Sequence, residues 1–119
     1  MELEKLTLEV GAARAGLKPV VPRAVQGESG VVHSFNLLFS DGDRFYAFDI
    51  YDSVSTTEMV KSYAKKLDTG CSLVVVCPLE RADDDARQLA ASYEIRIISP
   101  EAAATFFSLE RPPSTRRSG

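Results

Sequence analysis

Three polar side chains interrupt two apolar runs between residues 33 and 52, HSFNLLFSDGDRFYAFDIYD. Asn36 lies in the first run, and Asp49 and Tyr51 lie in the second. Because Asp49 and Tyr51 are two positions apart, their side chains share one face of a β-strand. A carboxylate on a packed face needs a partner or water, since burying it unpaired costs several kcal/mol. Asn36, Asp49 and Tyr51 are therefore the first candidates for a site, and polar residues on a solvated sheet face are the alternative.

Four further side chains are candidates for binding a nucleic acid or a partner protein: His33, Lys61, Lys65 and Lys66. His33 is the only histidine, and an imidazole suits a general acid or base at neutral pH. The three lysines fall in a segment with helical periodicity. The alternatives are a structural histidine and a solvated helix face.

Composition indicates a soluble globular domain, with 45% hydrophobic and 26% charged residues among 119. The net charge is −3, and the last nine residues, RPPSTRRSG, hold three arginines and no acid. The preceding part therefore carries 11 basic against 17 acidic residues. This balance argues against a broad nucleic-acid-binding surface, which needs clustered Lys and Arg. We predict one domain over residues 1–110 and a flexible basic tail over 111–119.

The two cysteines indicate a reducing compartment. Cys71 and Cys77 bracket CSLVVVC, and on a strand they lie roughly 20 Å apart, too far for a disulfide. The chain has no CxxC spacing and one histidine, which disfavours a zinc site. No signal peptide and no apolar run of membrane-spanning length are visible, so we expect a cytoplasmic protein without a membrane partner.

Periodicity predicts four helices. The first covers residues 3–15, with an apolar face formed by Leu3, Leu6, Val10 and Ala13. The second begins at a capping box, Ser55 with Glu58, and reaches about Leu67 before Gly70. Its predicted apolar face is Met59, Val60, Tyr63, Ala64 and Leu67. The others cover residues 82–93 and 100–109.

The remaining segments predict a mixed sheet. Residues 31–39 and 44–51 form an antiparallel hairpin around Asp41-Gly42. Residues 72–77, a helix and residues 94–99 form a parallel βαβ unit. A short extended piece at 17–21 and a loop at 22–30 precede them. The predicted fold is α/β: a single three-layer domain whose mixed central sheet is flanked by helices.

This order of segments resembles the restriction-endonuclease-like fold, the PD-(D/E)XK superfamily, and most of all its small archaeal and Mrr-type domains. The resemblance covers residues 3–100. Four stretches carry it: AGLKPVV, GESGVVHSFNLLF, FYAFDIYD and YAKKLDTGCSLVVVCP. In active members an Asp on the second strand and a Glu or Asp on the third bind a divalent metal. A Lys two residues later acts on the attacking water.

The resemblance places Asn36 at the Asp position, Asp49 at the Glu/Asp position and Tyr51 at the Lys position. Asp49 alone matches, so the resemblance implies a degenerate site, with Asp49 a metal ligand only if the site is active. Some members carry the Lys on the following helix, where Lys61, Lys65 or Lys66 would serve. A second carboxylate would have to come from Glu28, Asp43 or Asp52, none of which stands at the family position.

Two classes of function follow from this resemblance. The first is a non-catalytic module that binds a protein or, weakly, a nucleic acid, uses no cofactor, and is compatible with a homodimer. The second is a Mg²⁺-dependent DNA or RNA endonuclease with a rearranged site. A tRNA-splicing-endonuclease subunit is a variant of the second, and an accidental likeness to the nuclease fold is a third possibility.

Overall fold

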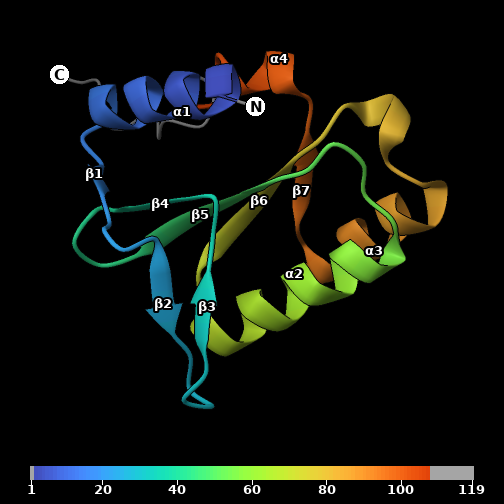
Figure 1. Ribbon diagram of the computed structural model, residues 1–119, viewed down its shortest axis with the longest axis horizontal. Coiled ribbons are helices and arrows are strands. Elements are labelled where there is room, and N and C mark those ends of the chain that lie inside the picture. The colour runs from blue at the N-terminus through green and yellow to red at the C-terminus, as the bar shows by residue number, and fades with distance from the viewer. Residues whose placement is uncertain (1, 108–119) are drawn as a thin grey trace, which may run out of the picture.

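A five-stranded mixed sheet separates two helical layers (Figure 1). Its strands lie in the order β1 (Lys18–Pro19), β4 (Leu37–Ser40), β5 (Phe45–Ile50), β6 (Ser72–Val76) and β7 (Arg96–Ile98). β5, β6 and β7 are parallel, whereas β4 runs antiparallel to both β1 and β5. The predicted fold class, with its hairpin and its parallel βαβ unit, is confirmed.

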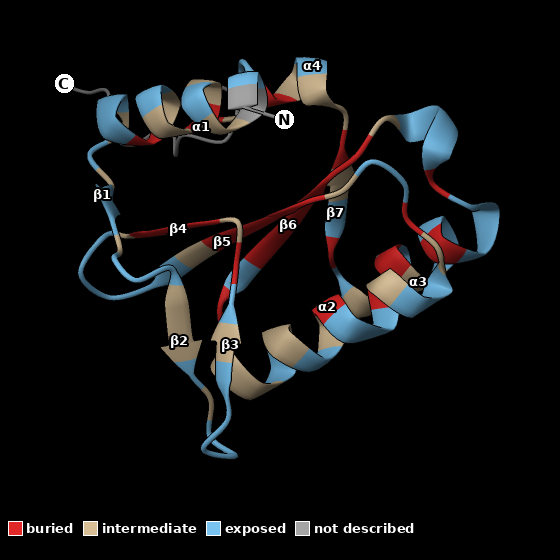
Figure 2. Cartoon of the chain, in the orientation of Figure 1, coloured by how far each residue is buried: buried red, intermediate tan, exposed pale blue. Residues whose placement is uncertain are grey.

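The helices cover both faces of the sheet. α1 (Glu2–Arg14) and α4 (Pro100–Ala103) lie on one face, and α2 (Thr56–Thr69) and α3 (Asp84–Tyr93) lie on the other (Figure 1). A short 3-10 helix, η1 (Leu79–Arg81), precedes α3. Figure 2 shows the buried residues gathered along the strands between these layers. A hydrophobic core lies on each face of the sheet. Alternate residues of a strand contribute to the two cores, because successive side chains point to opposite faces.

This computed structural model describes residues 2–107. The predicted tail, 111–119, and the predicted end of the last helix near Leu109 lie outside the described residues. Within the described part of the chain, no helix is long and apolar enough to cross a membrane. Cys71 and Cys77 are buried and free, as their spacing predicts.

The predicted first strand, 31–39, is in fact two strands separated by a bend. β3 (Val32–Ser34) pairs with β2 (Ala24–Gln26), which lies inside the predicted loop, and only β4 pairs with β5. Strict alternation would place Phe35 beside Leu37, yet Phe35 packs in the core under α2 and Leu37 in the core under α1. The break occurs at Asn36, and it sends β3 toward α2.

The second predicted helix begins and ends where the sequence indicates. The backbone N–H of Ser55 donates to Glu58 Oε1 at 2.8 Å, which completes the capping box, and Gly70 adopts φ 73° at the C-cap. Its predicted apolar face is partly wrong: Val60 and Leu67 are exposed. α2 instead turns Ser62 inward and stacks Tyr63 on Tyr93 of α3, with ring centroids 3.7 Å apart.

The predicted apolar face of the first helix is wrong as well. Leu8 and Ala12 pack against the sheet, while Leu3, Leu6 and Val10 face solvent. Gly11 allows this orientation, since a Cβ at that position would lie 3.1 Å from the Phe107 ring. The helix carries two apolar stripes, and periodicity alone does not tell which stripe meets the sheet.

Substitutions in α1 distinguish its two stripes. We expect Leu8→Ala to lower the free energy of unfolding by about 2–5 kcal/mol, because it opens a cavity in the core. The matched variant Leu6→Ala should change it by less than about 0.5 kcal/mol, because Leu6 is exposed. Urea unfolding in dilute solution measures both, and equal losses would contradict the observed orientation of α1.

Candidate functional site

Asp49 lies buried near the end of the central strand β5. The residue is 3% exposed, and its backbone lies opposite Val75 in the parallel β5–β6 ladder, one position beyond the last β4–β5 pair. The side chain points to the face covered by α2, where Oδ2 lies 2.8 Å from Lys65 Nζ. Ser62, also on α2, donates its hydroxyl to the same oxygen at 3.3 Å. The carboxylate therefore has a cation and a hydrogen-bond donor inside the fold.

Lys65 connects α2 to two other elements. Its ammonium also donates to the backbone carbonyl of Ser34 at 3.0 Å, and it lies 4.6 Å from the centroid of the Phe35 ring. β3 and the bend after it thus cover the ion pair from outside. Because both charges are held by hydrogen bonds in a poorly solvated place, their attraction exceeds that of a surface pair.

Asn36 supplies a hydrogen-bond acceptor to the backbone of β5 at the point where the β4–β5 ladder ends. The last ladder pair is Leu37 with Phe48, and one position further on the Asn36 side-chain oxygen accepts from the Ile50 N–H at 2.7 Å. The amide side chain does what the carbonyl of a continuing strand would do. The structure therefore accounts for Asn36 at the bend without any bound ligand.

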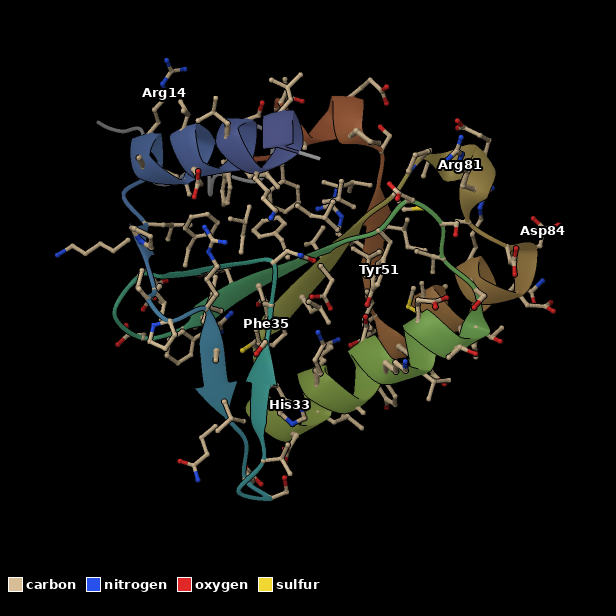
Figure 3. The ribbon with its side chains drawn as sticks, in the orientation of Figure 1. Arg14, His33, Phe35, Tyr51, Arg81 and Asp84 are labelled. Atoms are coloured by element: carbon tan, nitrogen blue, oxygen red, sulfur yellow. The ribbon has the colours of Figure 1, made fainter. Side chains whose placement is uncertain are left out.

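Tyr51 is half-buried and packs against the core under α2 (Figure 3). Burial raises the pKa of its phenol, the Ser62 hydroxyl acts in the opposite direction, and the negative charges of Asp49 and Glu58 raise it further. Tyr51 is therefore a neutral phenol at neutral pH, and it supplies no cation to this site.

His33 belongs to a second cluster, which attaches the β2–β3 hairpin to α2. Its Nε2 lies 2.7 Å from Asp68 Oδ2, and Ser29 donates its hydroxyl to the same oxygen at 2.7 Å. The Ser29 N–H donates to Asp68 Oδ1 at 2.9 Å. Hydrogen bonds from Ser29 and His33 lower the pKa of Asp68 to about 2. A Cβ at Gly27 would collide with this carboxylate, so the loop of the hairpin packs directly on it.

The three lysines of α2 differ in their surroundings. Lys65 is paired with Asp49, and Lys66 donates to the carbonyls of Tyr93 and Glu94, at the C-terminus of α3, at 2.8 and 2.9 Å. Lys61 is exposed, and its charge helps to lower the pKa of Glu58, chiefly set by hydrogen bonds from Ser55. Of the three lysines, Lys61 is the one whose side chain is exposed, while Lys65 and Lys66 are partly buried.

The structure brings Asp49, Tyr51 and Lys65 together and adds Ser62, which the sequence analysis missed. A helix position facing a strand carboxylate is visible only after α2 is docked. The possible second carboxylates, Glu28, Asp43 and Asp52, are all exposed. Within residues 2–107, no three His, Cys, Asp or Glu side chains come close enough to hold a metal ion.

Comparison with known proteins found one similar fold and no matching family. No family model matches the chain, and no curated protein matches it. The crystal structure of AF1548, a protein of unknown function, superposes over 82% of this chain with a TM-score of 0.58 and 15% sequence identity. The chain covers 58% of AF1548. At this identity, the similarity shows a shared fold only.

Removal of Lys65 tests how far the fold depends on the ion pair. We expect Lys65→Met to lower the free energy of unfolding by about 3–5 kcal/mol, because it leaves the Asp49 carboxylate buried and unpaired. The double variant Asp49→Asn/Lys65→Met should recover part of this loss, because no charge remains to be buried. Urea unfolding of the wild type, both single variants and the double variant gives the coupling energy. Additive losses would contradict the pairing.

The Asp68 cluster predicts a stability loss in acid. The pKa of Asp68 is lowered from 3.8 to about 2 in the folded chain, so its contribution is complete above pH 3.8 and is lost as the pH falls toward 2. We expect the difference in urea midpoint between wild type and Asp68→Asn to shrink over this interval. Asp43→Asn, in the exposed turn, is the matched control. A difference that is independent of pH would contradict the assignment.

Proposed function

We propose that this chain is a non-catalytic domain of the restriction-endonuclease-like (PD-(D/E)XK) class that serves as a binding module. The proposal is supported by the mixed three-layer fold and by the sequence resemblance over residues 3–100. Asp49, the buried acid on β5, occupies the position at which active members of the family have a metal-binding carboxylate. A protein partner is favoured over a nucleic acid.

One observation supports the proposal that the domain is not catalytic. Lys65 Nζ lies 2.8 Å from Asp49 Oδ2 and neutralises this carboxylate inside the fold. A metal-dependent nuclease needs an acidic residue that is open to a hydrated metal and to a phosphodiester. Asp49 is 3% exposed and contacts Lys65 and Ser62 of α2, and the Phe35 ring lies 4.6 Å from the Lys65 ammonium. Neither a metal ion nor a phosphate reaches it without displacing the lysine.

The other two family positions support the same conclusion. Asn36 offers no charge, and its side-chain oxygen is occupied by the Ile50 N–H. Tyr51 is a neutral phenol in place of the family lysine. A single carboxylate binds Mg²⁺ poorly, because this ion is held by several oxygen ligands in a strict octahedron.

The charges favour a protein partner. Lys65, Lys66 and His33 all contact acceptors within the fold, so they contribute less to binding phosphate groups than their number suggests. The net charge of −3 also opposes association with a polyanion. Exposed apolar side chains, by contrast, occur on α2 at Val60 and Leu67 and on β3 at Val32, and side chains of this kind contribute to protein interfaces.

A Mg²⁺-dependent nuclease with a rearranged site remains the second candidate, because one observation favours it. Lys65 comes from the helix that follows β5 and reaches the strand carboxylate. Some relatives place their lysine on this helix. This reading requires Asp49 to exchange its lysine for a metal ion, with β3 and Phe35 moving aside to admit the substrate.

Metal binding separates the two candidates. We expect calorimetry at about millimolar Mg²⁺ or Mn²⁺ to show no heat of binding to the wild type, because Asp49 is already paired. We also expect no cleavage of single- or double-stranded DNA or RNA in the presence of either metal.

The control for both measurements is Asp49→Asn, after its folding has been checked by circular dichroism. Heat of binding and cleavage that are present in the wild type and absent from Asp49→Asn would establish the nuclease. Cleavage that persists in Asp49→Asn would instead indicate a contaminating enzyme.

A further inference from the structure

A cavity of about 610 Å³ lies at the beginning of the three parallel strands, on the sheet face that α1 and α4 cover. Residues of these strands form its floor: Tyr46 on β5, Ser72 and Val74 on β6, and Arg96 on β7. Phe106, which follows α4, contributes to its wall. The volume lies within the range of about 300–1,000 Å³ that small-molecule sites have. Asp49 points to the opposite face of the sheet, so this cavity is separate from the site described above.

The short helical layer on this face accounts for the cavity. α1 and α4 have 13 and 4 residues, whereas α2 and α3 on the other face have 14 and 10. Phe48 and Ile98, further along their strands, are buried on the face that α1 and α4 cover. Ser72 and Arg96, at the beginning of β6 and β7, are exposed. The small side chain of Ser72 lies opposite Tyr46 in the ladder, and it leaves space in the middle of the floor.

A fixed carboxylate lies at the β5 end of the cavity. Asp41, in the turn before β5, lines the cavity and accepts the Tyr46 hydroxyl at 2.9 Å through Oδ2. Its Oδ1 accepts the backbone N–H groups of Asp43 and Arg44 at 2.9 and 2.8 Å. These hydrogen bonds, first that from Arg44 and then that from Asp43, lower the pKa of Asp41 below its usual value. The group is therefore a carboxylate at neutral pH, positioned by the turn, and its Oδ2 can accept a further donor.

The β7 end of the cavity carries the opposite charge. The Arg96 guanidinium lies 5.3 Å from the centroid of the Phe106 ring, and its five N–H donors can serve more than one acceptor. Lys66 and Glu94 line the same end, where the Lys66 ammonium donates to the Glu94 carbonyl at 2.9 Å. Two cations and one carboxylate leave this end with one net positive charge, against the negative charge of Asp41 at the other end.

We propose that this cavity binds a short zwitterionic molecule, with its ammonium at Asp41, its carboxylate at Arg96 and an apolar body against Phe106. Opposite charges at the two ends favour a ligand that carries the complementary pair, because a ligand with one charge leaves one end unmatched. β6 separates β5 from β7, so the two ends belong to strands about 10 Å apart. An extended peptide of about three residues with free ends has this length. The inference is independent of whether the Asp49 site is catalytic.

Blocked peptides test the two ends separately. The probe is the tripeptide Ala-Phe-Ala, titrated to about 10 mM into the isotopically labelled full chain and followed by NMR. We expect saturable shifts at the amides of Ser72 and Arg96, with a Kd of about 0.1–5 mM, since exposed charges contribute modestly to affinity. Acetylation of the peptide's N-terminus and amidation of its C-terminus should each weaken binding about three- to fivefold.

Two variants assign each end of the peptide to its residue. In Asp41→Asn, which keeps a side-chain acceptor in the turn, acetylation of the peptide should no longer weaken binding, while amidation still does. The reverse is expected in Arg96→Gln. The matched control is Asp43→Asn, which changes an acid of the same exposed turn that does not line the cavity. It should bind all forms of the peptide like the wild type.

Three results would overturn the proposal. The first is the lack of a saturable shift in the wild type up to about 10 mM peptide. The second is equal affinity of the wild type for the free peptide and for the peptide blocked at both ends. The third is an effect of acetylation in Asp41→Asn as large as in the wild type. Circular dichroism checks that each variant is folded, and the blocked peptides test both ends in the wild type without any substitution.

Discussion

The carboxylate of Asp49 lies where three elements meet, and its neutralisation is the constraint on which the centre of this fold depends. A charge in the interior of a sheet requires a partner of opposite charge with additional hydrogen bonds. Lys65 and Ser62 provide both from one face of α2. The same lysine holds the Ser34 carbonyl, so the ion pair also fixes the approach of the β2–β3 hairpin.

This requirement explains features of α2 that its hydrophobic pattern does not. The helix turns a serine and a lysine toward the sheet and leaves Val60 and Leu67 in solvent. Its register is set by the ion pair at one side and by the stack of Tyr63 on Tyr93 at the other. At the C-terminal end of α2, the Asp68 carboxylate contacts the Ser29 hydroxyl and the His33 ring. These contacts are a second attachment of the β2–β3 hairpin to α2. Polar contacts therefore act together with the burial of Met59 and the tyrosine stack in setting how α2 lies.

The same contacts form one network. A strand acid, a helix lysine and a buried serine meet at a single carboxylate oxygen, since both the Lys65 ammonium and the Ser62 hydroxyl contact Asp49 Oδ2. Such a network stabilises one arrangement of its members, and here it joins the central strand, α2 and the β2–β3 hairpin.

The sequence by itself determined the fold class, the capped helix from Ser55 to Gly70, the parallel βαβ unit and the need of the Asp49 carboxylate for a partner, because these depend on local periodicity and local hydrogen bonds. Three things were decided only by the tertiary structure. They are the stripe of α1 that meets the sheet, the lysine that meets Asp49, and the bend at Asn36 that pairs β3 with β2. Each depends on contacts between residues far apart in the chain. Helical spacing gives two equivalent faces on α1 and three lysines on α2, and only packing against the sheet distinguishes them.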